Sequence, residues 1–111
     1  MKKLSLILLV YLGLIGTAFA DHSTVGLDKL KATNDCEFCH LKGTNLSGQD
    51  FSGAKINISN FVGADLSGAN LSGADLTGAN FKAAVLDGAD FSEAILCNTK
   101  MSNGDIDNSG C

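Results

Sequence analysis

The sequence predicts an all-β repeat solenoid, and three features of the residue order point to that fold class. Large apolar residues recur at every fifth position from Leu41 to Ile106, and a small residue stands two places before most of them. Asn, Asp and Gly fill many of the positions between, and these are residues that turns prefer. A fixed short period over most of a chain is typical of solenoids, in which each structural unit stacks on its neighbours.

The first twenty residues have the three parts of a secretory signal. Lys2 and Lys3 precede an apolar run over residues 4–16, and Ala18-Phe19-Ala20 offers a cleavage site of small residues. We therefore expect residues 1–20 to be a signal peptide and the mature chain to begin at Asp21. A retained membrane anchor is the alternative, but the apolar run is shorter than the roughly 20 residues that a spanning helix needs.

The mature chain is expected to be a single acidic domain. Removal of the signal takes away two lysines and leaves 91 residues with six Lys against twelve Asp and Glu, a net charge of −6. Because the chain is acidic and has no Arg, its surface should repel nucleic acid phosphates. It also has no Pro and no Trp, and so it offers few stacking side chains. We expect periplasmic or secreted localisation, no nucleic-acid partner and no membrane contact after cleavage, with the oligomeric state left open.

The period of five residues excludes a helix or an ordinary strand over this length. An α-helix repeats every 3.6 residues and a strand every two, and a Gly in most units costs a helix about 1 kcal/mol each. A chain that turns a corner once per unit fits the pattern. The large inward residues are Leu41, Leu46, Phe51, Ile56, Phe61, Leu66, Leu71, Leu76, Phe81, Leu86, Phe91, Leu96, Met101 and Ile106.

Units such as Ala64-Asp65-Leu66-Ser67-Gly68 and Ala74-Asp75-Leu76-Thr77-Gly78 closely resemble the pentapeptide-repeat family. The resemblance implies a right-handed, four-sided (quadrilateral) β-helix with twenty residues per coil. It also implies that cysteine-containing caps bracket the repeats. We expect an N-terminal cap over residues 21–40, repeats over residues 41–106 and a C-terminal cap over residues 107–111.

Two details follow from the coil of twenty residues. A short helix between Asp21 and Asp35 should cover the first coil through Leu27 and Leu30, because the open end of a solenoid carries unpaired backbone groups. At the other end, Ile106 should stack on Leu86 inside the rod.

The four cysteines of a short exported chain are expected to form disulfides. Cys39 and Cys97 would lie about 2.9 coils apart, or about 14 Å at the spacing of neighbouring strands, which is too far for a bond between the two ends. We therefore predict the pairs Cys36–Cys39 and Cys97–Cys111.

Cys36-Glu37-Phe38-Cys39-His40 is also a C-x-x-C-H motif, which is the signature of covalent c-type haem attachment. The alternative function is thus an electron carrier with haem on Cys36 and Cys39 and with His40 as iron ligand. We expect no cofactor, because Cys39 and Leu41 are in register as the inward residues of the first repeat. Zinc is a weaker alternative, since only His22 or a carboxylate could complete a set of four ligands.

No set of residues suggests catalysis, and the main hypothesis is a non-catalytic module that binds an unidentified protein partner. The outward apolar residues Ile58, Val62, Val85 and Ile95 are candidate contacts. Some cytoplasmic pentapeptide-repeat proteins resemble DNA and inhibit gyrase. This chain shares their acidity but differs in its signal peptide and in its few coils.

Overall fold

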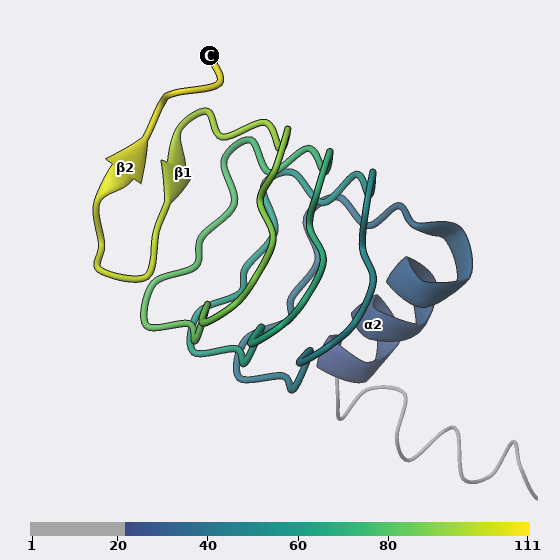
Figure 1. Cartoon of the computed structure of the whole chain (residues 1–111). Coiled ribbons are helices and arrows are strands. Elements are labelled where there is room, and N and C mark those ends of the chain that lie inside the picture. The colour runs from purple at the N-terminus through teal and green to yellow at the C-terminus, as the bar shows by residue number, and fades with distance from the viewer. Residues whose placement is uncertain (1–21) are drawn as a thin grey trace, which may run out of the picture.

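The computed structural model describes residues 22–111, and the expected signal peptide lies outside them (Figure 1). The described part consists of a helix, α2 (His22–Thr33), a stack of coils, and two short strands, β1 (Thr99–Lys100) and β2 (Ile106–Asp107). Within this part of the chain no helix combines the length and the apolar character needed to cross a bilayer.

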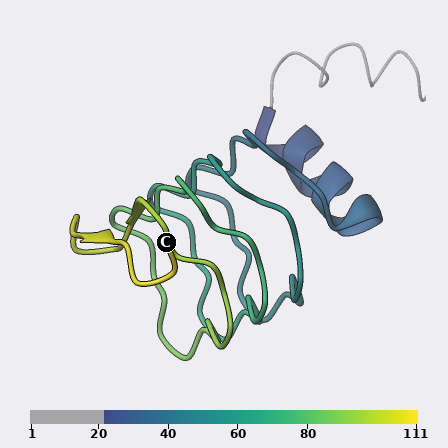
Figure 2. The same cartoon turned by 90° about the horizontal axis from the view of Figure 1, so that it is seen from above.

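The coils form a right-handed quadrilateral β-helix, as the sequence predicts (Figures 1 and 2). Parallel β-bridges join residues twenty positions apart, from Asp35↔Lys55 to Asn80↔Lys100, and one occurs at every fifth residue between them. Each bridge occupies one side of the coil, so four units complete one turn. The ladder begins at Asp35, six residues before the expected first repeat at Leu41, and Cys36 takes the inward position of that additional unit.

Most corners are tight turns stabilised by two local hydrogen bonds. The N–H of the small residue donates to the carbonyl of the preceding large residue, as from Ala69 to Leu66 at 3.0 Å. The side chain of the Asn or Asp accepts the N–H two places later, as from Ser67 to Asp65 at 3.0 Å. The third residue of the turn has a positive φ, 68° at Gly68, which favours Gly because it has no Cβ.

The large and small inward residues fill the interior of the rod. Leu46, Leu66 and Leu71 have no exposed surface, and the rings of Phe61 and Phe81 stack with their centroids 4.8 Å apart. The inward positions predicted for the middle coils are therefore confirmed. Burial of these side chains, at about 1.5–3 kcal/mol each, is the main stabilising term of the fold.

Helix α2 covers the first coil, as expected. Leu30 is buried and Leu27 packs partly against the core, so these two residues close the N-terminal end of the interior. Figure 1 shows α2 at this end of the stack of coils. The helix ends at Thr33, whose hydroxyl donates to the carbonyl of Lys29 and accepts the N–H of Asp35. Asn34 follows with a φ of 59° and turns the chain into the first coil.

The C-terminal end differs from the sequence prediction. Parallel hydrogen bonding continues to Ser102, but β2 then turns back and pairs antiparallel with β1, so that Ile106 lies opposite Lys100. Ile106 is 46% exposed and does not stack on Leu86 within the coil. The expectation of repeats up to Ile106 is corrected here, because Gly104 (φ 94°) allows a hairpin in place of a further corner.

Candidate interaction surfaces and the disulfide-closed ends

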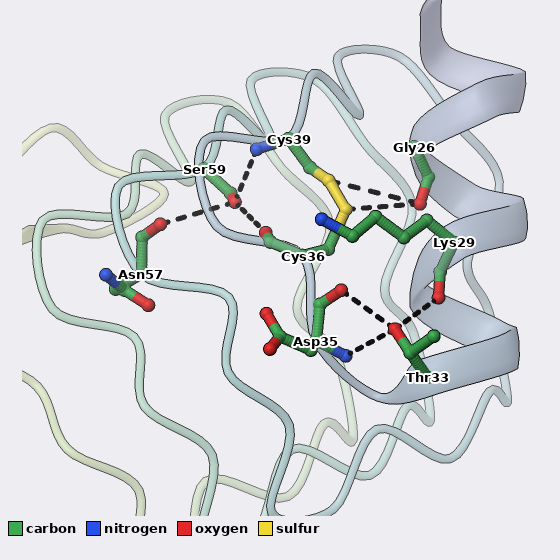
Figure 3. The surroundings of a disulfide bond; sticks show 8 residues. All are labelled: Gly26, Lys29, Thr33, Asp35, Cys36, Cys39, Asn57 and Ser59. Carbon is green, nitrogen blue, oxygen red and sulfur yellow. Dashed lines mark hydrogen bonds between the residues drawn. A yellow bond between two sulfur atoms is a disulfide. The ribbon is translucent and has the colours of Figure 1, made fainter.

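The cysteines of the first coil lie beneath helix α2 (Figure 3). Cys36 and Cys39 form a disulfide in the structure, and their Cα atoms are 5.5 Å apart. The Cys36 sulfur lies 3.2 Å from the carbonyl oxygen of Gly26. A Cβ on Gly26 would lie 3.4 Å from the Cys39 sulfur, so Gly at this helix position lets the helix approach the disulfide closely.

Ser59, from the second coil, links the two cysteine residues from the other side (Figure 3). Its buried hydroxyl donates to the carbonyl of Cys36 at 2.8 Å and accepts the N–H of Cys39 at 2.9 Å. The C-x-x-C segment is therefore held between helix α2 and the second coil, and it serves as a structural element of the N-terminal end.

This environment does not fit covalent haem. Thioether links require both sulfurs at a surface that a macrocycle can reach, whereas Cys36 is fully buried and Cys39 is 9% exposed. His40 lies on the outer side of the coil, where its backbone is bridged to Asn60. Cys36, Cys39 and His40 are thus placed near one another, but the helix that covers the sulfurs occupies the space that haem would need.

The second disulfide lies in the C-terminal segment. The structure bonds Cys97 to Cys111, with a Cα–Cα distance of 4.8 Å. Beside it, the Gly110 N–H donates to the Leu96 carbonyl at 2.8 Å, and the Asn98 N–H donates to Asn108 Oδ1 at 2.7 Å. These contacts tie the last residues of the chain to one side of the last coil.

Charges on the coils are sorted by side. Residues 45–53, 65–73 and 85–93 form two neighbouring sides, which we call the acidic sides because they carry carboxylates and no lysine. Their carboxylates are Asp50, Asp65, Asp87, Asp90 and Glu93. The lysine side consists of residues 40–43, 60–63, 80–83 and 100–102. It carries Lys42, Lys82, Lys100 and His40 and no carboxylate.

The turn hydrogen bonds lower the pKa of carboxyl groups on the acidic sides. The pKa of Asp65 and Asp90 lies below the ordinary value of 3.8, first because the next-but-one Ser hydroxyl donates to the carboxylate and second because its N–H does. The pKa of Asp50 is lowered mainly by the N–H of Ser52. Folding therefore favours the charged form of these groups.

We predict that acid destabilises the protein through these aspartates. A carboxyl group whose pKa is lower in the folded state stabilises the fold above its unfolded pKa and loses that effect as pH falls through the folded value. The melting temperature should thus be nearly constant from about pH 7 to pH 5 and should fall below about pH 4. Calorimetry as a function of pH measures this dependence.

A variant with both Asp65→Asn and Asp90→Asn supplies the control. Asn accepts the same turn N–H at other units, as Asn70 does from Ser72 at 3.0 Å, so the fold should be retained. Its melting temperature should fall less between pH 5 and pH 2 than that of the unmodified protein. An unchanged pH dependence would show that these groups do not contribute.

Three of the four predicted apolar contact residues are well exposed. Ile58, Val85 and Ile95 are 50%, 44% and 42% exposed, whereas Val62 is half-buried. Phe38 is not among the predicted contacts, but it is 62% exposed and lies at the same corner as Ile58, one coil away. Phe38 and Ile58 occupy the third turn position, where most units have Gly, and this position can be recognised in the sequence only once Cys36 is known to be the inward residue of its unit. In the structure both residues have a positive φ.

The described residues offer no assembled centre for metal chemistry. Between residues 22 and 111 no three His, Cys, Asp or Glu side chains gather in a way that could hold a metal ion.

Comparisons with known proteins agree with this architecture. The family model for pentapeptide repeats matches residues 35–68 and 64–103, with eight copies. A pentapeptide-repeat protein from the thylakoid lumen of Arabidopsis thaliana is similar at 34% identity and a TM-score of 0.62, over 73% of this chain and 52% of that chain. HetL, a pentapeptide-repeat protein involved in heterocyst differentiation regulation in the cyanobacterium Nostoc sp. strain PCC 7120, is 28% identical. Its TM-score is 0.47, over 66% of this chain and 43% of that chain.

The chain spans about half the length of these two solved structures. A search of curated proteins finds no match.

Proposed function

Because the chain belongs to the pentapeptide-repeat family, we propose that it is an exported, non-catalytic module that presents the sides of its solenoid to a partner protein. The sorting of charge by side is the observation that carries this proposal. Since side chains fill the interior of the rod, the outer sides are the surface left for recognition. Solenoids commonly use such extended sides for binding.

The acidic sides are the proposed binding surface. Carboxylates on a rigid, hydrogen-bonded ladder hold fixed spacings, with Asp50 and Asp90 in one column on either side of Asn70. A basic partner surface would be attracted to this array over a distance set by the ionic strength. The lysine side lies next to the side that carries Asp65 and opposite the side that carries Asp50 and Asp90, and it would orient the rod relative to that partner.

Export is supported by three observations. Residues 1–20 have the parts of a secretory signal, the structure contains two disulfides, and one similar protein is from the thylakoid lumen. Disulfides persist mainly in oxidising compartments, which agrees with a periplasmic or secreted protein.

The mass of the intact protein from a periplasmic fraction tests export, the disulfides and the haem alternative together. We predict a chain that begins at Asp21, lacks the four cysteine hydrogens and carries no added group. Covalent haem would add about 600 Da that denaturation does not remove. The bacterial host must make c-type cytochromes, because only such a host can attach haem covalently. A retained Met1 would contradict export.

Site-specific photocrosslinking in cells tests the interaction surface. Ser52 on the acidic sides and Lys42 on the lysine side are both exposed, and each follows a buried large residue. A photoreactive residue at Ser52 should give a discrete adduct, which should weaken in a variant with Asp50→Asn and Asp90→Asn. Equal adducts from both positions, or none, would contradict binding through the acidic sides.

A further inference from the structure

The last complete coil, residues 81–100, leaves part of its backbone unpaired. One coil earlier, the N–H groups of Leu66, Gly68, Leu71 and Gly73 donate to carbonyls of the next coil, each at 2.8 Å. Within residues 22–111, the equivalent N–H groups of the last coil have no such acceptor. They are those of Leu86, Gly88, Phe91 and Glu93.

Carbonyl groups of the same segment also lack hydrogen-bond partners. Ala64 and Ala69 accept N–H groups from the next coil, from Val85 and Asp90. Among the described residues, none donates to the carbonyls of Ala84 and Ala89. We call residues 84–93 the open half-coil, because they present both donors and acceptors of an unpaired β-ladder.

The side chains of this coil are also less covered than those beneath them. Leu66 and Leu71 have no exposed surface, whereas Leu86 and Phe91, which stack on them, are only partly buried. In the last coil, Val85 and Ile95 occupy the outward bridge position. In all the remaining units of the ladder this position is polar. Two apolar side chains, Val85 and Ile95, thus lie on the outer side of the coil near the unpaired backbone.

The N-terminal end of the rod and the rest of the last coil are covered. Helix α2 lies on the first coil, and the hairpin of β1 and β2 with the Cys97–Cys111 disulfide lies at the opposite side of the last coil (Figures 1 and 2). At the two ends of the rod, the open half-coil is therefore the segment on which a further strand could continue the ladder. An unpaired strand edge with apolar neighbours is a template for such pairing.

Charge decides which occupant suits it. Asp87, Asp90 and Glu93 stand around the open half-coil, and residues 85–93 contain no lysine. A second copy docked through the same edge would bring these carboxylates together, and helix α2 covers the other end of a copy. Basic side chains on an incoming strand would instead lie beside these carboxylates.

We propose that the open half-coil binds an extended, basic segment of a partner protein, which adds a parallel β-strand to the ladder. The proposal rests on the proposed function and names the chemistry of its partner. Alternate residues of the segment would cover Leu86 and Phe91 with small or apolar side chains, and the residues between would place Lys or Arg near Asp90 and Glu93. Main-chain hydrogen bonds of this kind supply affinity, while the alternate side chains supply specificity.

A designed peptide tests the proposal. The probe contains two copies of Ala-Lys-Leu-Ser-Gly and is capped at both ends, and the matched control has Asp in place of Lys. At about 1 mM probe, which detects even weak binding, the amide resonances of Leu86, Gly88, Phe91 and Glu93 should shift and their hydrogen exchange should slow. The control peptide should give neither effect.

Two variants locate the binding. The double variant Asp90→Asn with Glu93→Gln should bind the lysine probe about three to ten times more weakly, since each exposed charge pair contributes little. Asp35→Asn, in the first unit of the ladder at the other end of the rod, should bind normally. Shifts that map to other sides of the rod, or no shift at 1 mM probe, would overturn the proposal.

Slow exchange of the four amides without any peptide would also overturn it, and a dependence on protein concentration would then identify a second copy as the occupant. None of these failures affects the crosslink expected at Ser52, which tests binding through the sides of the rod. The two proposals can therefore fail independently.

Discussion

Leu71→Asp should unfold the protein, whereas Ser72→Asp should leave it folded. Leu71 has no exposed surface, and it lies inside the rod between coils that contribute Phe51 and Phe91. A carboxylate there would have neither water nor a partner, which costs several kcal/mol, comparable to the whole stability of a small domain. Circular dichroism and a melting curve of each variant measure the difference.

Ser72 is the matched control because it is the next residue and faces outward. It donates its hydroxyl and its N–H to Asn70 Oδ1, so Ser72→Asp loses one local hydrogen bond at a partly exposed site. We expect a cost of about 1 kcal/mol or less. Equal melting temperatures for the two variants would mean that the inward and outward positions are assigned wrongly.

Removal of the Cys97–Cys111 disulfide should have the second largest effect. The two cysteines are 14 positions apart, and release of a loop of about this length lowers the free energy of unfolding by about 3 kcal/mol. For a domain of this size the melting temperature should fall by about 10–20 °C. A double variant with Cys97→Ala and Cys111→Ala, unfolded by urea and by heat, measures the loss.

The loss should be local at first. Gly110 N–H, bonded to the Leu96 carbonyl, should exchange faster in this variant, whereas Leu66 N–H, bonded to the Val85 carbonyl, should keep its protection. Ser109→Ala, beside Cys111 on the same segment, is the control and should change stability little. If the Cys97/Cys111 variant and the unmodified protein have the same melting temperature, the disulfide does not stabilise the C-terminal end.

The middle of the rod could be predicted almost completely from the sequence. Its period of five is carried by residue size, which is a local property, and the large residues from Leu46 to Phe81 are buried as predicted. The capping helix could also be predicted, because Leu27 and Leu30 lie three residues apart and the open end of a solenoid needs a cover. Burial and backbone pairing therefore decide these parts of the fold.

The surface could be predicted less well. The sorting of charge follows from the coil of twenty residues and was open to prediction, since residues twenty apart share a side. The exposure of Phe38 was missed because its unit precedes Leu41, and Cys36, unlike the large residues of later units, gives no clear sign of an inward position.

The sequence by itself determined the class of fold, its coil of twenty residues and the identity of most inward residues, because these follow from size and spacing along the chain. Only the tertiary structure decided where the ladder starts and stops. The apolar pattern continues to Ile106, yet β2 pairs with β1 and leaves the edge at Leu86 and Phe91 uncovered. A hairpin and a further coil satisfy similar backbone groups, so the choice between them depends on contacts between distant residues, such as Gly110 with Leu96.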